Sequence, residues 1–422
     1  MRPSPTTGRL NDFQRTMLHW NRLHPYNSVE VARIDAAISP ARFAAAVAHV
    51  LEAAGLTNYS VGDGRFGYAG GPVEVVPKLL DGGDALEQVH REMERELNEP
   101  FPCGPEPFQP FRWFLANGNG EAFVGLTYFH VAADAHAAGR LLGEVIAACF
   151  DGSPRALRDE SLVRKSGSRL PMGGPSAIVG EIRQMLAMRQ SFRSPPCLAD
   201  GFRNAWFARS LDAGETTRTL ELAKRHGTTV NDLFLAALLD AVAPLATDRL
   251  GQGRRNQLSV GCIANLRPEM PERRRDDFGV SLGSFAVTHP VPADMELPGL
   301  LADVHRQTTA AKRSQCYLAS WIEFRLGNFL FARQRGNKRR NYYRKVYPAW
   351  AGLTNLKKDA VEGDGWQAMD YIRAVSTGPA LPLVLAVTGY RGRLNFGFIH
   401  RPGVIDEEEA RGIADRFIAS IT

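Results

Sequence analysis

The spacing of apolar side chains predicts helices and strands mixed from the start of the chain. The segment VEVARIDA, from Val29, alternates between apolar and polar positions as a half-buried strand does. The next segment, SPARFAAAVAHVLEAAGL, has helical spacing, with Ser39 as the N-cap, Pro40 at the first helical position and Gly55 beyond the end. Residues 11–23 carry the same helical pattern.

Two pairs of apolar runs predict β-hairpins. FRWFLANGNGEAFVGLTYFH holds two runs separated by NGNG at residues 117–120, a sequence typical of a tight turn. LPLVLAVTGYRGRLNFGFIH is the second, turned at residues 391–392. Between them, residues 151–200 are rich in Ser, Arg, Gly and Pro, which is typical of a connector, although IVGEIRQMLAMRQ within it has a helical pattern.

Beyond the connector the mixture of elements resumes. TTRTLELAKRHG, TTVNDLFLAALLDAVAPLATDRL and residues 292–325 have helical patterns, and QLSVGCIANLRP is a strand candidate. DEEEARGIADRFIASI closes the chain as a helix with acidic residues in its first turn. A chain of 422 residues is long for one core. We therefore predict two α/β lobes of α+β type, over residues 1–155 and 206–422, joined by a connector over residues 156–205.

Composition places the chain among soluble globular proteins, with 44% hydrophobic and 23% charged residues. No apolar run has the length or position of a secretory signal or a bilayer span. The five cysteines lie far apart without CxxC spacing, which argues against a zinc ribbon or a disulfide framework. This cysteine usage fits a reducing compartment, so we expect a cytoplasmic protein.

The net charge of +6 is concentrated in one segment. Residues 333–345, RQRGNKRRNYYRK, hold seven basic residues and no acidic one. Such a segment is either a solvated loop or a surface for a phosphorylated cofactor, an anionic lipid or an acidic protein. Nucleic acid is not expected, because no recognisable nucleic-acid motif accompanies this single cluster.

The stretch TYFHVAADAHAAGRLL carries the strongest chemical signal. His130 stands where an apolar strand ends, and Asp134 suits the N-cap of a helix over residues 135–150. A histidine there can act as a general base, since it titrates near neutral pH, but it can equally be a structural histidine in an ordinary turn. Metal binding is not expected, because His130, Asp134 and His136 do not converge in either a strand or a helix.

Four stretches stand in a recognisable order: FHVAADA, RHGTTVNDLFLAALLDAV, VGCIANLRPEMPERRRDDFGVSLGSF and LPLVLAVTGYRGRLNFGFIHRPGVIDEEEARGIADRF. In this order the chain resembles the CoA-dependent acyltransferase superfamily, which includes chloramphenicol acetyltransferase, condensation domains of nonribosomal peptide synthetases and wax ester synthases. FHVAADA occupies the place of the family motif HHxxxDG. His130 matches the catalytic histidine and Asp134 the aspartate, whereas Phe129 replaces the first histidine and Ala135 the glycine.

The resemblance implies two chloramphenicol-acetyltransferase-like lobes that form a V, with His130 midway along a tunnel between them. It implies transfer of an acyl group from a thioester to a small-molecule hydroxyl or amine, in natural-product or lipid biosynthesis, without a metal or a tightly bound cofactor. The donor is acyl-CoA or an acyl or peptidyl carrier protein. The motif aspartate would pair with an arginine, for which Arg267 in NLRPE is the candidate.

Groups that stabilise the oxyanion are expected as well. Asn355 and Ser376 are the first candidates, ahead of Thr377 and Ser284. Arg339 and Arg340 of the basic segment would meet the phosphates of CoA or the acidic surface of a carrier protein. Each of these side chains can also be read as capping a turn or lying in solvent.

Two alternatives to this enzyme stay open. Ala135 allows neither positive φ nor close backbone approach as freely as glycine, which favours a catalytically silent condensation-like module that binds a carrier protein or a pathway intermediate. The same fold could also cyclise or isomerise a tethered intermediate. The pair Tyr342-Tyr343 leaves room for a weak membrane-surface contact, and we expect a monomer or a dimer.

Overall fold

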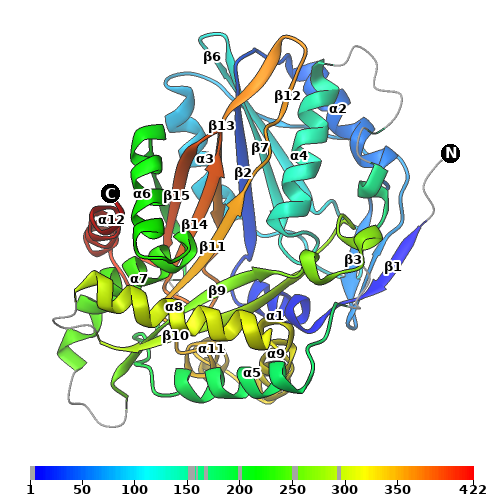
Figure 1. The fold of residues 1–422 in the computed structure, drawn as a ribbon. Coiled ribbons are helices and arrows are strands. Elements are labelled where there is room, and N and C mark those ends of the chain that lie inside the picture. The colour runs from blue at the N-terminus through cyan, green and yellow to red at the C-terminus, as the bar shows by residue number, and fades with distance from the viewer. Residues whose placement is uncertain are drawn as a thin grey trace.

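The computed structural model describes residues 5–150, 157, 160–165, 170–197, 202–249, 255–291 and 296–422. Its strands form two six-stranded sheets and one three-stranded sheet, and helices pack around these sheets (Figure 1). The small sheet has the order β1 (Thr6–Arg9), β4 (Arg65–Tyr68) and β3 (Tyr59–Gly62). The α+β character expected for the fold is confirmed.

The first large sheet draws strands from both halves of the chain. Its order is β12 (Glu362–Gly363), β13 (Trp366–Val375), β2 (Asn27–Ile34), β7 (Glu121–Phe129), β6 (Phe111–Gly118) and β5 (Lys78–Leu80). Neighbouring strands are antiparallel except β5 and β6. Because β13 pairs along β2, two strands of the second half complete the sheet of the first half. The sheets therefore do not follow the expected division of the chain at every strand.

The second large sheet is built entirely from residues 205–400. Its order is β10 (Leu282–Pro290), β9 (Gln257–Asn265), β11 (Ala351–Lys357), β14 (Leu383–Tyr390), β15 (Arg393–His400) and β8 (Ala205–Leu211). β11 runs parallel to both of its neighbours, and the other pairs are antiparallel. This sheet contacts the first one where β13 packs against β14 and β15.

Helices cover both sheets. The first sheet lies between α3 (Ala85–Asn98) on one face and α4 (Ala135–Phe150) on the other, with α2 (Pro40–Ala53) against α4. The second sheet is covered by α6 (Ala213–Arg225), α7 (Val230–Val242), α8 (Leu297–Ser314) and α12 (Glu407–Ile421). In the view of Figure 1, helices lie beneath β10, among them α1 (Asp12–Asn21), α5 (Pro175–Met188), α9 (Trp321–Phe331) and α11 (Tyr343–Val346).

Local signals placed several boundaries correctly. Ser39 caps α2 by accepting a hydrogen bond from the Arg42 amide, and Thr229 and Asp232 form a capping box at the start of α7. At the tip of the β6–β7 hairpin, Asn119 and Gly120 both have positive φ. The segment IVGEIRQMLAMRQ forms most of α5, within the predicted connector, parts of which lie outside the described residues.

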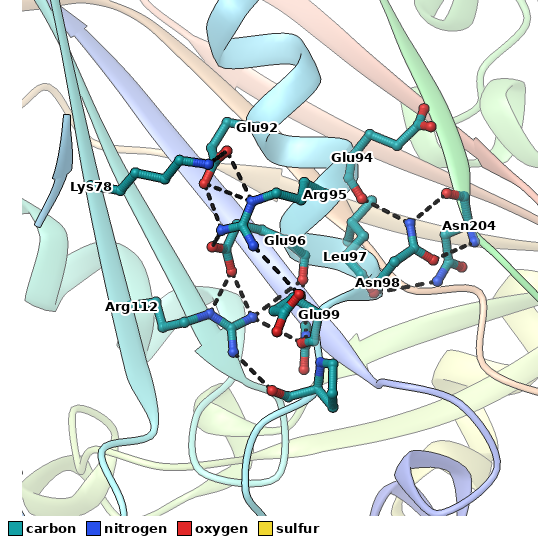
Figure 2. Close-up of polar contacts among 12 residues, drawn as sticks. Lys78, Glu92, Glu94, Arg95, Glu96, Leu97, Asn98, Glu99, Arg112 and Asn204 are labelled. Atoms are coloured by element: carbon teal, nitrogen blue, oxygen red, sulfur yellow. Dashed lines mark hydrogen bonds and ion pairs between the residues drawn. The ribbon is translucent and has the colours of Figure 1, made fainter. Parts of the chain in front are cut away.

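A polar network fastens α3 to its surroundings (Figure 2). Glu96, near the end of the helix, accepts a hydrogen bond of 2.6 Å from Arg112 on β6, and Glu92 pairs with Lys78 at 2.5 Å. Asn98 exchanges two hydrogen bonds of 2.8 Å with the backbone of Asn204, just before β8. The helix on the first sheet is thus tied to the start of the second sheet.

Among the described residues, no single helix has the length and apolar character needed to cross a membrane, and by those two measures alone only the bent pair α6–α7 qualifies.

Candidate active site

A cavity enclosing about 180 Å³ lies where the two large sheets and the helices beneath β10 meet. Its wall includes the end of β7, parts of β2 and β13 from the first sheet, and parts of β9, β10 and β11 from the second. Aromatic side chains of α1 and α9 contribute an apolar surface. His130, Asp134, Arg267, Asn355 and Ser376 all lie on this wall, so the fold brings these sequence candidates to one place.

His130 follows directly on β7 and is held in one tautomer. Its ring stacks on Tyr26 with centroids 5.3 Å apart, and its Nδ1 lies 3.0 Å from the carbonyl oxygen of Ala133. A carbonyl oxygen only accepts hydrogen bonds, so Nδ1 carries the proton and Nε2 keeps the free lone pair. Burial lowers the pKa of His130, and the imidazole is therefore neutral at pH 7. The side chain is prepared to accept a proton.

Asp134 fixes the turn that carries His130. One carboxylate oxygen caps α4 by accepting from the Ala137 amide at 3.0 Å. The other accepts from the Ser281 amide at 2.8 Å and from Arg267 at 2.7 Å, so the expected ion pair is present. Burial opposes ionisation, but Arg267 and the amide donors outweigh it and lower the pKa of Asp134. Asp134 thus connects the start of α4 to Arg267 and to the backbone at Ser281.

Ala135, which replaces the glycine of the motif, occupies the first position of α4 and has no positive φ. A glycine is not needed there for backbone freedom. The Ala135 carbonyl accepts a hydrogen bond of 2.8 Å from Lys358, whose ammonium also pairs with Glu30 at 3.1 Å. Gly139 lies one turn along, and a Cβ on it would stand 1.5 Å from the Lys358 nitrogen. The close approach of the Lys358 side chain to the backbone of α4 therefore requires a glycine at position 139.

The two oxyanion candidates differ in their surroundings. Asn355 is an exposed residue of β11 on the cavity wall, and its side-chain amide makes no hydrogen bond within the described chain. Ser376 is buried, donates to the Pro25 carbonyl at 3.1 Å and accepts from Asn204 at 3.1 Å. The Ser376 hydroxyl thus joins the end of β13 to the polar network of α3, which leaves Asn355 as the freer donor.

Arg373 on β13 is a cavity residue that sequence reasoning missed. It is buried, and its guanidinium donates to Thr388 Oγ1 at 3.0 Å and to the Val387 carbonyl at 2.9 Å. No carboxylate pairs with it in the described ranges. Its charge contributes to lowering the pKa of His130, so it lies in the same electrostatic environment. No local signal marked it, because its strand joins a sheet from the other half of the chain.

The basic segment does not line the cavity. It folds into α10 (Asn337–Arg340) and α11, in which Arg339 covers the ring of Phe331 at 4.6 Å and Arg340 that of Phe202 at 5.8 Å. The neighbouring Tyr342 and Tyr343 are buried. Both rings pack into the aromatic core around Phe331, so they are not available to a membrane surface, and the weak membrane contact stays a prediction without support from this pair.

Two further side chains belong to the wall. His136 is half-buried, and its Nε2 lies 3.9 Å from the carboxylate of the exposed residue Asp276. Cys262 on β9 is buried, which raises the pKa of its thiol to about 12. A thiol of that acidity is a poor nucleophile at pH 7.

Neither a protein-family model nor a curated protein matches this sequence. Solved structures do match its fold over nearly the whole chain. The first condensation domain of the CDA synthetase superposes with a TM-score of 0.66 at 15% identity, covering 98% of this chain and 95% of that one. The starter condensation domain of rhizomide synthetase RzmA, a mutant in complex with C8-CoA, gives 0.67 at 17% identity, covering 98% and 94%.

A third match is polyketide synthase associated protein 5 from Mycobacterium tuberculosis, with a TM-score of 0.63 at 13% identity and 99% of both chains covered. The chain therefore has the fold of the condensation domains, which confirms the fold class expected from the sequence resemblance. The V shape and the tunnel between two lobes stay predictions.

Proposed function

We propose that the protein is an acyltransferase that moves an acyl group from a thioester to a hydroxyl or amine acceptor, with His130 as the general base. The observation that carries the proposal is the neutral imidazole on the cavity wall, with Nδ1 fixed by Ala133 and Nε2 free. The resemblance to the acyltransferase motif and the fold of the condensation domains agree with it.

In this reaction Nε2 accepts the proton of the acceptor as its oxygen or nitrogen attacks the thioester carbonyl carbon. The carbonyl oxygen takes up the negative charge, next to Asn355 and the guanidinium of Arg373 as its donors, with Ser376 the less available third. The carbon–sulfur bond then breaks, and the imidazolium returns the proton to the departing sulfur. All proton transfers pass through His130, and no enzyme-bound acyl intermediate is required.

The donor is acyl-CoA or an acylated carrier protein, in natural-product biosynthesis. One matching structure holds C8-CoA, and another is a four-domain nonribosomal peptide synthetase bound to AMP and glycine. Arg339 and Arg340 are the proposed contacts for the CoA phosphates or an acidic carrier surface.

The test is mass-spectrometric detection of acyl transfer from a panel of acyl-CoA and acyl-carrier thioesters. We expect His130→Ala to lose at least about 100-fold of the turnover, the low end of general-base contributions. His136→Ala, which removes a second histidine whose Nε2 lies 3.9 Å from Asp276, should retain the turnover. Wild-type turnover in His130→Ala would contradict the proposal. If the wild-type protein bound a carrier protein but transferred no acyl group from any donor, it would be a silent binding module.

A further inference from the structure

Two carboxyl groups on the cavity wall have no role in the reaction described above. Glu181 on α5 is 2% exposed and Glu323 on α9 is 8% exposed. Both line the cavity that contains His130. Neither carboxyl group makes a hydrogen bond or an ion pair within the described part of the chain. Burying an ionisable group without a partner is costly, so these two residues require an explanation.

Helix α5 buries Glu181 on its inner side, together with Ala177 and Met188, and leaves three large apolar side chains on its outer side. Val179, Ile182 and Leu186 on its outer side are about half exposed, while Glu181 is buried. A helix held only by apolar burial would show the opposite arrangement. This orientation of α5 therefore indicates that Glu181 has a role in the cavity that it lines.

The groups around the pair cannot neutralise two negative charges. Tyr347 uses its hydroxyl to donate to the Glu323 backbone carbonyl at 3.2 Å, and burial keeps the Cys316 thiol uncharged with a pKa raised to about 11. Gln184 accepts a hydrogen bond from the Ala286 amide at 3.2 Å. No basic side chain contributes to the electrostatics of Glu181 or Glu323.

Both carboxyl groups of the pair are consequently protonated at pH 7. Burial raises the pKa of Glu181 to about 8. Burial and the neighbouring charge of Glu181 raise the pKa of Glu323 well above its usual range. A cation placed between them would favour both ionised forms and displace those protons.

We propose that Glu181 and Glu323 bind a protonated amino group of a substrate, separate from the group that reacts at His130. An ammonium group has three donors for the carboxylate oxygens, and the stacked rings of Phe13 and Phe324, with centroids 4.4 Å apart, offer it an aromatic wall. The described residues hold no group of three or more acidic, histidine or cysteine ligands, so a divalent metal ion would lack its usual oxygen set.

The assignment of this amino group to a substrate rests on the proposed acyl transfer, whereas binding of the amine does not. A protonated amine has no lone pair and cannot be the nucleophile. The substrate therefore carries at least two functional groups, a cationic amine and a second group that takes part in the reaction. The amine lies either on the acceptor or on the acyl chain.

Binding is tested by isothermal titration calorimetry at pH 7 with n-hexylammonium chloride against 1-hexanol. We expect the ammonium to bind the wild-type protein at least about tenfold more tightly than the alcohol. A hydrogen bond between charged groups contributes enough binding free energy for a difference of that size. Titrations in buffers of different ionisation enthalpy should report proton release on binding the amine but not the alcohol.

Variants locate the site. Glu181→Gln and Glu323→Gln keep the side-chain shape and should each lose about tenfold or more in affinity for hexylammonium, with 1-hexanol unchanged. Glu92→Gln, a buried glutamate in the α3 network outside the cavity, is the matched control and should bind like wild type. Equal affinity for amine and alcohol in the wild-type protein, or unchanged amine affinity in both cavity variants, would overturn the proposal.

The source of the amino group is decided by acyl-transfer assays. Aminohexanol is compared with hexanol as acceptor, and aminohexanoyl-CoA with hexanoyl-CoA as donor. A lower KM for one amino compound, lost in Glu181→Gln, identifies the substrate that carries the cation; no preference in either arm overturns the assignment to a substrate. Hexylammonium binding without any acyl transfer would refute the proposed function and leave the ammonium site intact.

Discussion

The ion pair between Asp134 and Arg267 should hold the active-site turn and join the two halves of the chain. The residues are 133 positions apart, and their side chains are 1% and 4% exposed. Asp134→Ala would leave the Arg267 guanidinium buried, with the Gly279 carbonyl at 3.3 Å as its one remaining partner among the described residues. Arg267→Met would leave the carboxylate buried, with the amides of Ala137 and Ser281 as its donors.

The size of the effect follows from these contacts. Breaking a buried pair by removing one partner costs about 3–5 kcal/mol of the free energy of unfolding. Asp134→Ala also removes the cap of α4, which adds about 1 kcal/mol, so it should be the more damaging single change. The double variant leaves no unpaired charge, and we expect its loss to fall short of the sum of the single losses by about 2–3 kcal/mol.

Urea unfolding followed by tryptophan fluorescence measures this cycle. The matched control is Arg33→Met, which breaks the half-exposed pair of Arg33 and Glu121 at 2.7 Å and should cost under about 1 kcal/mol. Because the folded-state pKa of Asp134 lies below 3.8, its contribution is present above that pH and is lost as the pH falls further. If the loss in the free energy of unfolding of the double variant equalled the sum of the two single losses within about 0.5 kcal/mol, the reasoning would be refuted.

Three other predictions concern the reaction and the turn. Since the pKa of His130 is lowered, the acid limb of kcat/KM should lie below pH 6.5, with activity lost as the pH falls; a limb above 6.5 would contradict this. Gly139→Ala should displace Lys358 and lower stability by about 1–3 kcal/mol in thermal unfolding, and an unchanged Tm would refute the steric argument. Charge reversal at Arg339 and Arg340 should raise the KM for acyl-CoA and weaken its dependence on salt; an unchanged KM would remove both residues from the donor site.

Local patterns identified much of the secondary structure. Cap residues such as Ser39 and turn residues such as Asn119 affect the backbone only a few positions away, so their effect can be predicted from the sequence. The same holds for His130 and Asp134, which belong to one strand end and one helix start. Strands that are not bounded by such cap or turn residues, among them β11 and β13, were not predicted.

The sequence by itself determined the hairpins, the capped helices and the strand–turn–helix unit that carries His130, because each depends on neighbours in the chain. Only the tertiary structure decided that β13 completes the first sheet, which brings Arg373 to the cavity. It also decided which side of α5 faces inward: Ile182 lies half exposed on the outer side of the helix, whereas the charged residue Glu181 is buried on the inner side. Such placements arise from contacts between segments more than a hundred residues apart, and no local pattern encodes them.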